Sequence, residues 1–209
     1  MRATHRLARI TGRERTGAAA DLLALGLGNP GSEYERTRHN VGAEAVELLA
    51  SRHGVALRAE RGIPARLGEA RIAEKQLALA VPLTYMNESG LAARALVRRC
   101  SLEDLARLVV VHDELDLPVG TVRVKAGGGT AGHNGLRSLQ SHLHSLDFVR
   151  VRIGVGKPPG RMAGADYVLR RPGRDEREAL DVALAEAADA VELVLGLGTD
   201  GAMNAVNGR

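Results

Sequence analysis

Polar residues capable of acid–base chemistry follow the apolar segments of this 209-residue chain. Asn29, Asp113 and Asn134 each come shortly after such a segment, and His39 follows Asn29 along the chain. Ligands of open α/β sheets bind outside the carboxyl ends of the strands. The four residues are therefore expected to meet in one crevice.

A histidine beside a carboxylate has the parts of a general base, because the carboxylate orients the ring and stabilises its protonated form. Asparagine side chains donate and accept hydrogen bonds, which suits them to bind an amide or to stabilise a carbonyl oxygen. Each residue alone also fits a structural role: Asn29 in a turn, His39 and Asn40 as a helix cap, and Asp113 as a strand-end cap. Only their combination favours catalysis.

The nucleophile of such a site is expected to be water. Cys100 follows a predicted helix with no histidine beside it in sequence, and the chain has no G-x-S-x-G motif. A metal site is a weaker alternative. The segment 113–116 holds three acidic residues, but His142 and His144 are two apart on a helix and point in different directions. We expect no metal ion and no other cofactor.

The glycines at 26, 28 and 31 match the G-x-G-x-x-G pattern of dinucleotide-binding proteins. Pro30 and the polar stretch 32–39 delay the next predicted helix, so no helix N-terminus lies where a pyrophosphate would bind. The acidic residue Glu60 lies well beyond the expected spacing of about 20 residues. A dinucleotide-dependent oxidoreductase is thus disfavoured.

The composition is that of a globular protein, with 44% hydrophobic and 26% charged residues. Aromatic residues make up only 2%, which disfavours a row of stacking platforms for single-stranded nucleic acid. Residues 1–20 hold five Arg and one Glu and account for the whole formal net charge of +4. The rest of the chain is therefore neutral, and it would have to bind a polyanion through locally clustered cations rather than through its net charge.

Residue patterns predict strands that alternate with helices. Strands are expected at 22–27, 66–73, 76–82, 108–111, 121–125 and 148–155, and helices at 40–52, at 89–99, from 101–104, from 136 and at 175–195. A glycine-rich loop is expected at 127–135 and a loop rich in Gly and Pro at 156–165. The loop 156–165 and the residues 165–170 that follow it are expected to form either a mobile lid or surface filling. The alternation favours an α/β fold: a single three-layer domain with a twisted mixed β-sheet flanked by helices.

The expected organisation is a disordered basic tail at 1–20 and one domain at 21–209. No apolar run approaches 18 residues, so no membrane span is predicted, and the N-terminus lacks the apolar core of a signal peptide. The single cysteine, Cys100, excludes an internal disulfide and fits a reducing cytosol.

Five segments, in this order and spacing, resemble the bacterial peptidyl-tRNA hydrolases. They are Leu27–Asn40, which begins Leu-Gly-Asn-Pro-Gly, and then Pro82–Gly90, His112–Asp116, Gly127–Leu136 and Phe148–Gly156. Each segment alone is a modest signal, whereas all five together are very specific, and the resemblance covers residues 22–207. The departures are the Arg-rich residues 1–20, Val81 where the family often has Lys, and Thr130-Ala131 in the glycine-rich loop.

The resemblance implies a monomeric, metal-independent cytoplasmic esterase that cleaves the ester between a peptide and the 3′ end of tRNA. It implies that His39 is the general base for water, that Asp113 keeps His39 in its basic form, and that Asn29 distinguishes blocked from free amino groups. The positions that match substrate or tRNA contacts in the family are Tyr34, Tyr85, Met86, Asn87, Asn134, Lys125, His133 and Arg152. A non-catalytic RNA-binding protein on the same fold is the alternative.

Overall fold

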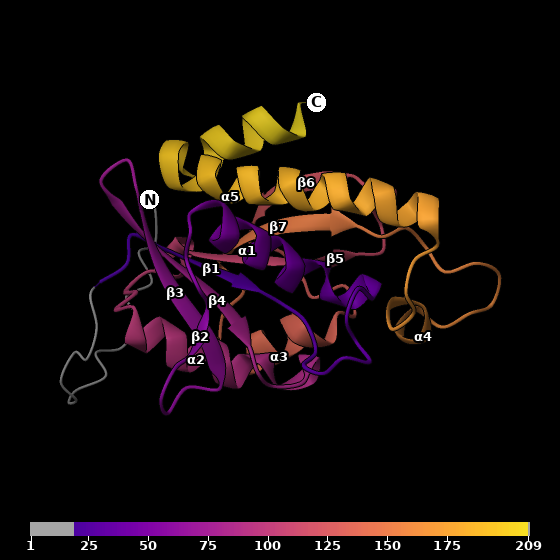
Figure 1. Cartoon of the computed structure of the whole chain (residues 1–209), viewed down its shortest axis with the longest axis horizontal. Helices are drawn as coiled ribbons and strands as arrows, with labels where there is room; N and C mark the ends of the chain where they lie inside the picture. Colours follow the sequence, from indigo (N-terminus) through magenta and orange to yellow (C-terminus); the bar gives the residue numbers. More distant parts are fainter. Residues whose placement is uncertain (1–18, 209) are drawn as a thin grey trace.

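Seven strands form one mixed β-sheet in the computed structural model of this chain, which describes residues 19–208 (Figure 1). The order across the sheet is β2-β3-β4-β1-β5-β7-β6. Strands β4, β1, β5 and β7 are parallel to one another, whereas β2, β3 and β6 pair in antiparallel fashion. The strands are β1 Leu22–Gly26, β2 Arg58–Ala59, β3 Ala65–Ile72, β4 Lys75–Pro82, β5 Leu108–Glu114, β6 Val122–Ala126 and β7 Val149–Gly154.

Helices cover both faces of the sheet, which confirms the expected three-layer α/β domain. Along β1, Leu22 and Ala24 pack with α1 and α5, whereas Leu23 and Leu25 pack with α2 and α3. Figure 1 shows α5 above the sheet and α2 and α3 below it. The helices are η1 Arg38–Asn40, α1 Val41–Arg52, η2 Met86–Glu88, α2 Ser89–Arg99, η3 Leu105–Arg107, α3 Asn134–Leu143, α4 Gly164–Val168 and α5 Arg174–Asn207.

Most of the predicted elements are present within a few residues of their expected bounds, but the helix expected from 101–104 is absent. Ser101 lies in a turn with φ 53°, and the Asp104 side chain accepts a hydrogen bond from the Ala106 N–H to begin only the short η3. The last helix extends to Asn207 and is broken at Gly198, where φ is 75°. Residues 1–18, nearly all of the predicted tail, lie outside the described residues.

Backbone contacts fix the start of α1 against the ends of β1 and β5. A Cβ atom on Gly42 would lie 2.2 Å from the carbonyl oxygen of Val111, and one on Gly26 would lie 2.4 Å from the carbonyl oxygen of Gly42. The Ala43 N–H donates to the Leu27 carbonyl at 2.9 Å. Only glycine permits this approach. It holds η1 beside the carboxyl end of β5.

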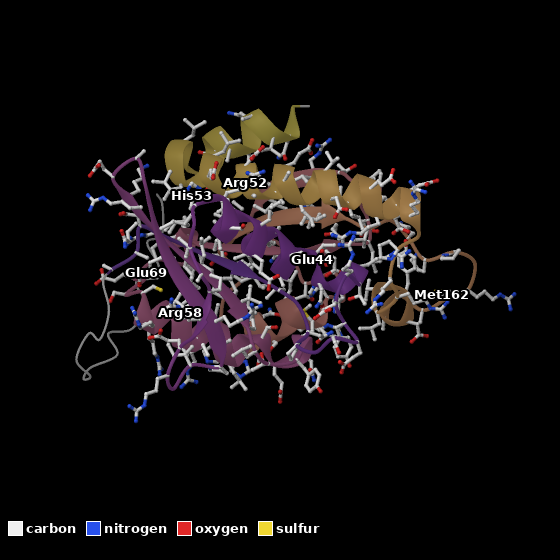
Figure 2. The ribbon with its side chains drawn as sticks, viewed as in Figure 1. Glu44, Arg52, His53, Arg58, Glu69 and Met162 are labelled. Atoms are coloured by element: carbon white, nitrogen blue, oxygen red, sulfur yellow. The ribbon has the colours of Figure 1, made fainter. Side chains whose placement is uncertain are left out.

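The other end of α1 is tied to α5 by side chains. Figure 2 shows Arg52 and His53 between these two helices. Arg52 Nη1 lies 2.5 Å from the Asp189 carboxylate, and His53 Nε2 lies 2.7 Å from that of Glu192. Within the part of the chain that the structure describes, no helix is long and apolar enough to cross a bilayer.

Candidate active site

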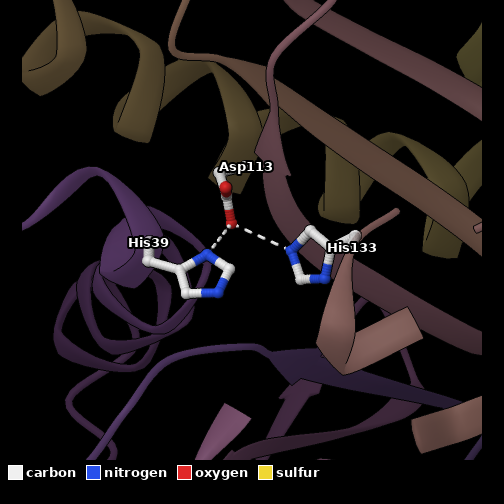
Figure 3. Close-up of side chains that lie close together, drawn as sticks. All are labelled: His39, Asp113 and His133. Atoms are coloured by element: carbon white, nitrogen blue, oxygen red, sulfur yellow. Dashed lines mark hydrogen bonds and ion pairs between the residues drawn. The ribbon is translucent and has the colours of Figure 1, made fainter. Parts of the chain in front are cut away.

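The carboxylate of Asp113, at the end of β5, lies between two histidines (Figure 3). Its Oδ1 atom is 2.8 Å from Nδ1 of His39 and 2.9 Å from Nε2 of His133. The three side chains are 3%, 9% and 8% exposed, respectively. The expected meeting of His39 with Asp113 is thus present, and His133 joins it from the turn before α3.

Hydrogen bonds determine which ring nitrogens carry protons. Nδ1 of His133 accepts from the backbone N–H groups of Gly135 at 3.1 Å and Leu136 at 3.4 Å, so its Nε2 carries the proton and donates to Asp113. The carboxylate can only accept, so Nδ1 of His39 also donates to it. No residue within 19–208 bonds to Nε2 of His39, whose lone pair is therefore left to accept a proton.

The electrostatics of the cluster suit a base. Burial lowers the pKa of His39, but the charge and hydrogen bond of Asp113 outweigh it and raise that pKa above its usual value. Burial alone would raise the pKa of Asp113, yet the two histidines hold it well below its usual range. Asp113 therefore stays ionised and can stabilise the imidazolium form of His39.

A third histidine, His112, lies behind this pair and does not ionise. Burial, with a smaller effect of His133, lowers the pKa of His112 to about 3. Its Nδ1 donates to the backbone carbonyl of Asp113 at 2.7 Å, and its ring lies 5.0 Å from that of His133. His112 thus packs the cluster as a neutral ring.

The cluster also has the spacing of a metal site, since His39, Asp113 and His133 offer ligand atoms within 4.8 Å of one another. A metal on Nε2 of His133 would force the ring proton onto Nδ1, where the N–H groups of Gly135 and Leu136 already point. The hydrogen-bond pattern around His133 therefore disfavours a metal ion.

The side chain of Asn29 is oriented by a second set of hydrogen bonds. Its Oδ1 accepts from the Met86 N–H at 2.7 Å, so its Nδ2 amino group is left as a donor. The backbone N–H and C=O of Asn29 bond to the side chain of Asn40, each at 2.9 Å. Asn40 makes no cap hydrogen bond to α1, so the expectation that it caps this helix is wrong. Sequence reasoning missed its role in holding Asn29.

We expect Asn40→Ala to lower the free energy of unfolding by about 1–3 kcal/mol, because both backbone groups of the half-buried Asn29 lose their partner. Urea denaturation followed by circular dichroism measures this loss. Asn40→Asp is the matched control: it keeps the acceptor for the Asn29 N–H but loses the donor, so its midpoint should lie between those of wild type and Asn40→Ala. A wild-type midpoint for Asn40→Ala would contradict the role of this pair.

The packing around the G-x-G-x-x-G motif and the late start of the next helix argue against nucleotide binding there. A Cβ atom on Gly28 would lie 2.8 Å from the Ala43 side chain and 3.3 Å from that of Asn40. The next helix begins only at Arg38–Asn40, so no helix N-terminus directly follows Gly31. The motif therefore lacks the helix N-terminus that binds a pyrophosphate in dinucleotide-binding folds.

The family model for peptidyl-tRNA hydrolase matches residues 23–209. The chain belongs to the peptidyl-tRNA hydrolase family.

Relatives from several organisms agree with this assignment. A peptidyl-tRNA hydrolase from Rhodococcus erythropolis is 50% identical over 182 residues, which cover 87% of this chain and 95% of the relative. One from Frankia alni is 50% identical over 179 residues, covering 86% and 88%. A crystal structure of peptidyl-tRNA hydrolase from Acinetobacter baumannii superposes with a TM-score of 0.83 at 36% identity and covers 90% of this chain and 96% of that one.

Several other positions resemble substrate contacts of the peptidyl-tRNA hydrolase family, and the structure places them on or directly before η2, at the start of α3 and in the loop after β1. The rings of Tyr34 and Tyr85 lie 6.2 Å apart, edge to face. Met86 is buried, and its sulfur lies 2.7 Å from where a Cβ of Gly135 would stand, which places Met86 beside the start of α3. Asn87 and Asn134 are exposed, one on η2 and the other at the start of α3. Their contacts with substrate remain predictions.

The predicted tRNA-binding cations lie on β6 and β7 at the edge of the sheet. In these strands Lys125 is opposite Arg150, and Arg123 is opposite Arg152, so the four side chains share one face. Lys125 is exposed, whereas Nη1 of Arg152 lies 3.7 Å from the Glu114 carboxylate. This face carries the clustered positive charge that a polyanion requires.

Arg150 was missed by sequence reasoning. It is 4% exposed, and its guanidinium donates to the carbonyl oxygens of Gly128 and Gly129 in the glycine-rich loop. Burial lowers the pKa of Arg150, and the nearby charge of Arg152 adds to this effect. The alternation of Val and Arg in 149–152 was the available signal, since it places both arginines on the face opposite the valines.

Proposed function

We propose that this chain hydrolyses the ester bond between a peptide and the 3′ end of tRNA, which recycles tRNA from prematurely released peptidyl-tRNA. The observation that carries the proposal is the free Nε2 of His39, whose other nitrogen is bound to the ionised and buried Asp113. An ester has a good leaving group, so a positioned water, one base and hydrogen-bond donors suffice.

In the proposed reaction, Nε2 of His39 takes a proton from water while the water oxygen attacks the ester carbonyl carbon. Asp113 stabilises the imidazolium that results. The bond between the carbonyl carbon and the ribose oxygen then breaks, and this oxygen takes the proton from His39. The products are a peptide with a free carboxyl group and a tRNA with a free hydroxyl group. A general base contributes about 10²–10⁴-fold to such a rate.

The free Nδ2 amino group of Asn29 supports a preference for blocked substrates. A peptide or N-acetyl group offers a carbonyl oxygen that can accept a hydrogen bond from this donor. A free amino group is an ammonium ion at neutral pH and can only donate. Asn29 is therefore proposed to bind peptidyl-tRNA while aminoacyl-tRNA is spared.

The acceptor end of tRNA is proposed to lie along the face that carries Arg123, Lys125 and Arg152, held through phosphate contacts rather than base readout. Tyr34, Tyr85, Asn87, Asn134 and His133 would contact the substrate near the ester, with Met86 along the peptide. We further propose that the chain acts as a monomer in the cytoplasm. Its only cysteine, Cys100, is buried as a free thiol, as suits a reducing compartment.

The test is release of N-acetyl-amino acid from tRNA, measured beside the unblocked aminoacyl-tRNA and repeated with EDTA. We expect cleavage of the blocked substrate only, at a rate that the chelator does not change. Binding of tRNA without cleavage would favour a non-catalytic RNA-binding protein. A loss of activity with EDTA that Zn²⁺ restores would make the cluster of His39, Asp113 and His133 a metal site.

A further inference from the structure

We propose that Arg38 is a positioning residue, which fastens the segment from α4 to the start of α5 onto η1 and so holds the base His39 in place. This inference rests on the proposed function, because it concerns how that reaction's base is held. Arg38 precedes His39 directly in η1, yet its side chain reaches away from the His39–Asp113–His133 cluster to residues more than a hundred positions later.

The guanidinium of Arg38 is bound on every side. Its Nε and Nη2 atoms donate to the two carboxylate oxygens of Glu176, at 2.6 and 2.5 Å. Its Nη1 donates to the carbonyl oxygen of Arg170 at 3.0 Å and to those of Tyr167 and Arg171 at 3.4 Å. Such a bidentate pair fixes both distance and orientation.

Tyr167 of α4 completes this contact. The guanidinium carbon of Arg38 lies 4.1 Å from the centre of the Tyr167 ring, and the Tyr167 hydroxyl donates to the carbonyl of Val155 just after β7. Arg38 is 7% exposed and Tyr167 is 9% exposed. The arginine thus joins η1, α4 and the start of α5 in one buried contact.

Further hydrogen bonds join the backbone of the residues before His39 to Arg170 and Arg171, which follow α4. The Arg38 N–H donates to the Arg170 carbonyl at 3.4 Å, and the Arg171 side chain donates to the carbonyls of Glu35 and Ser32 at 3.0 and 3.1 Å. Figure 1 shows α4 below the start of α5, and Figure 2 shows Met162 in the loop that leads into it. The residues before His39 and the residues after α4 therefore hold each other.

The coupling reaches His39 because η1 is a single turn. Successive side chains of a 3₁₀ turn point about 120° apart, so Arg38 and His39 are turned to different sides of one short rigid segment. If the Arg38 contacts are lost, Glu176 and the carbonyls after α4 lose their partner, and η1 is held on one side only. A displacement of His39 by about 1 Å from its productive position is enough to lower the rate by about 10²-fold.

The experiment compares Arg38→Ala, Arg38→Lys and Glu176→Gln with Arg174→Ala, on N-acetyl-aminoacyl-tRNA at a temperature at which all variants are folded. Arg174 is the matched control, since it is another arginine close to Glu176 in sequence, and among residues 19–208 its exposed side chain pairs with Glu178 alone. We expect Arg38→Ala to lower kcat by about 10²-fold. Its KM should change less than about twofold, because binding contacts are kept. Arg38→Lys and Glu176→Gln should show smaller losses, and Arg174→Ala none.

The pH profile separates positioning from simple loss of stability. Lysine keeps the charge of Arg38, so a shift in the acid limb of kcat for Arg38→Lys reports a changed geometry of His39 and Asp113. Because Asp113 raises the pKa of His39, a looser contact should move this limb to lower pH. An unshifted limb together with wild-type kcat in the folded variants would overturn the inference.

Failure of a variant to fold and failure of the proposed function can be told apart from failure of this inference. If Arg38→Ala does not fold, Arg38→Lys and Glu176→Gln decide, and wild-type kcat in both overturns the inference. If the wild-type chain itself does not cleave the blocked substrate, the proposed function fails. An active wild type with unaffected Arg38 variants contradicts only the role of Arg38.

Discussion

The His39→Ala variant is expected to lose about 10²–10⁴-fold in kcat on N-acetyl-aminoacyl-tRNA, since it removes the general base. Binding of tRNA should change little, because the proposed phosphate contacts lie on β6 and β7. Single-turnover release of the N-acetyl-amino acid measures the rate, and fluorescence anisotropy with labelled tRNA measures the binding.

The matched control for this variant is His53→Ala, at the far end of α1. The His53 side chain bonds to Glu192 on α5, far from Asp113, so its removal should leave kcat unchanged. If His39→Ala retains full activity, His39 does not take part in the reaction and is a structural residue of η1. If the wild type binds tRNA but neither it nor the variant turns over, the non-catalytic alternative is favoured.

The Asp113→Asn variant is expected to lower kcat by about 10²–10⁴-fold while it moves the acid limb of the pH profile to lower pH. The carboxylate both orients His39 and stabilises its imidazolium form. In the wild type His39 must be neutral to act, so activity is lost as pH falls through its pKa, which Asp113 raises above its usual value. Without that charge only burial remains, and the pKa of His39 falls.

Asp113→Asn should lower kcat but also keep His39 neutral to a lower pH, so its rate and its acid limb change in opposite senses at low pH. This combination distinguishes the loss of Asp113 from a general loss of activity. The measurement is kcat against pH for the wild type, Asp113→Asn and Asp116→Asn. Asp116 pairs with Lys157 on the exposed surface, so its variant should keep both the rate and the limb of the wild type. A limb that stays in place or moves to higher pH in Asp113→Asn would show that Asp113 does not set the pKa of His39.

The meeting of His39 with Asp113 was predictable from sequence because it depends on simple rules. Strands β1 and β5 are buried apolar runs that pair in parallel, so the residues that follow them reach the same edge of the sheet. The fold class likewise follows from the alternation of strands and helices.

The direction of loop side chains was not predictable in this way. His133 matches a tRNA-contacting position by resemblance, yet the structure turns its ring onto Asp113. That direction depends on a loop in which Gly127, Gly128, Ala131 and Gly132 all have positive φ, and residue periodicity carries no such information. The role of Asn40 was missed for a related reason: its side chain bonds to the backbone of Asn29, eleven residues earlier, and not to the first turn of α1.

The shortness of α4 and the distance in sequence between contacting segments explain what else could not be predicted. The segment 156–170 was open to two interpretations because its helix, α4, has only five residues, too few for a hydrophobic period to show. Arg38, which anchors this segment, is a charged residue next to the proposed base His39, and sequence alone gives no sign that Arg38 is buried. Such contacts between distant segments become visible only when the chain is folded.

The glycine contact between α1 and the sheet has a consequence for how this protein tolerates mutation. The separation of η1 from β5 is set by main-chain atoms at Gly26 and Gly42 rather than by the size of packed side chains. We therefore expect substitutions of apolar core residues to change thermal stability more than they change the distance between His39 and Asp113. A methyl group at Gly42 should have the opposite effect, because it would meet the Val111 carbonyl and push η1, with His39, away from β5. The distance between His39 and Asp113 should therefore tolerate substitution at most core positions but not at Gly26 or Gly42.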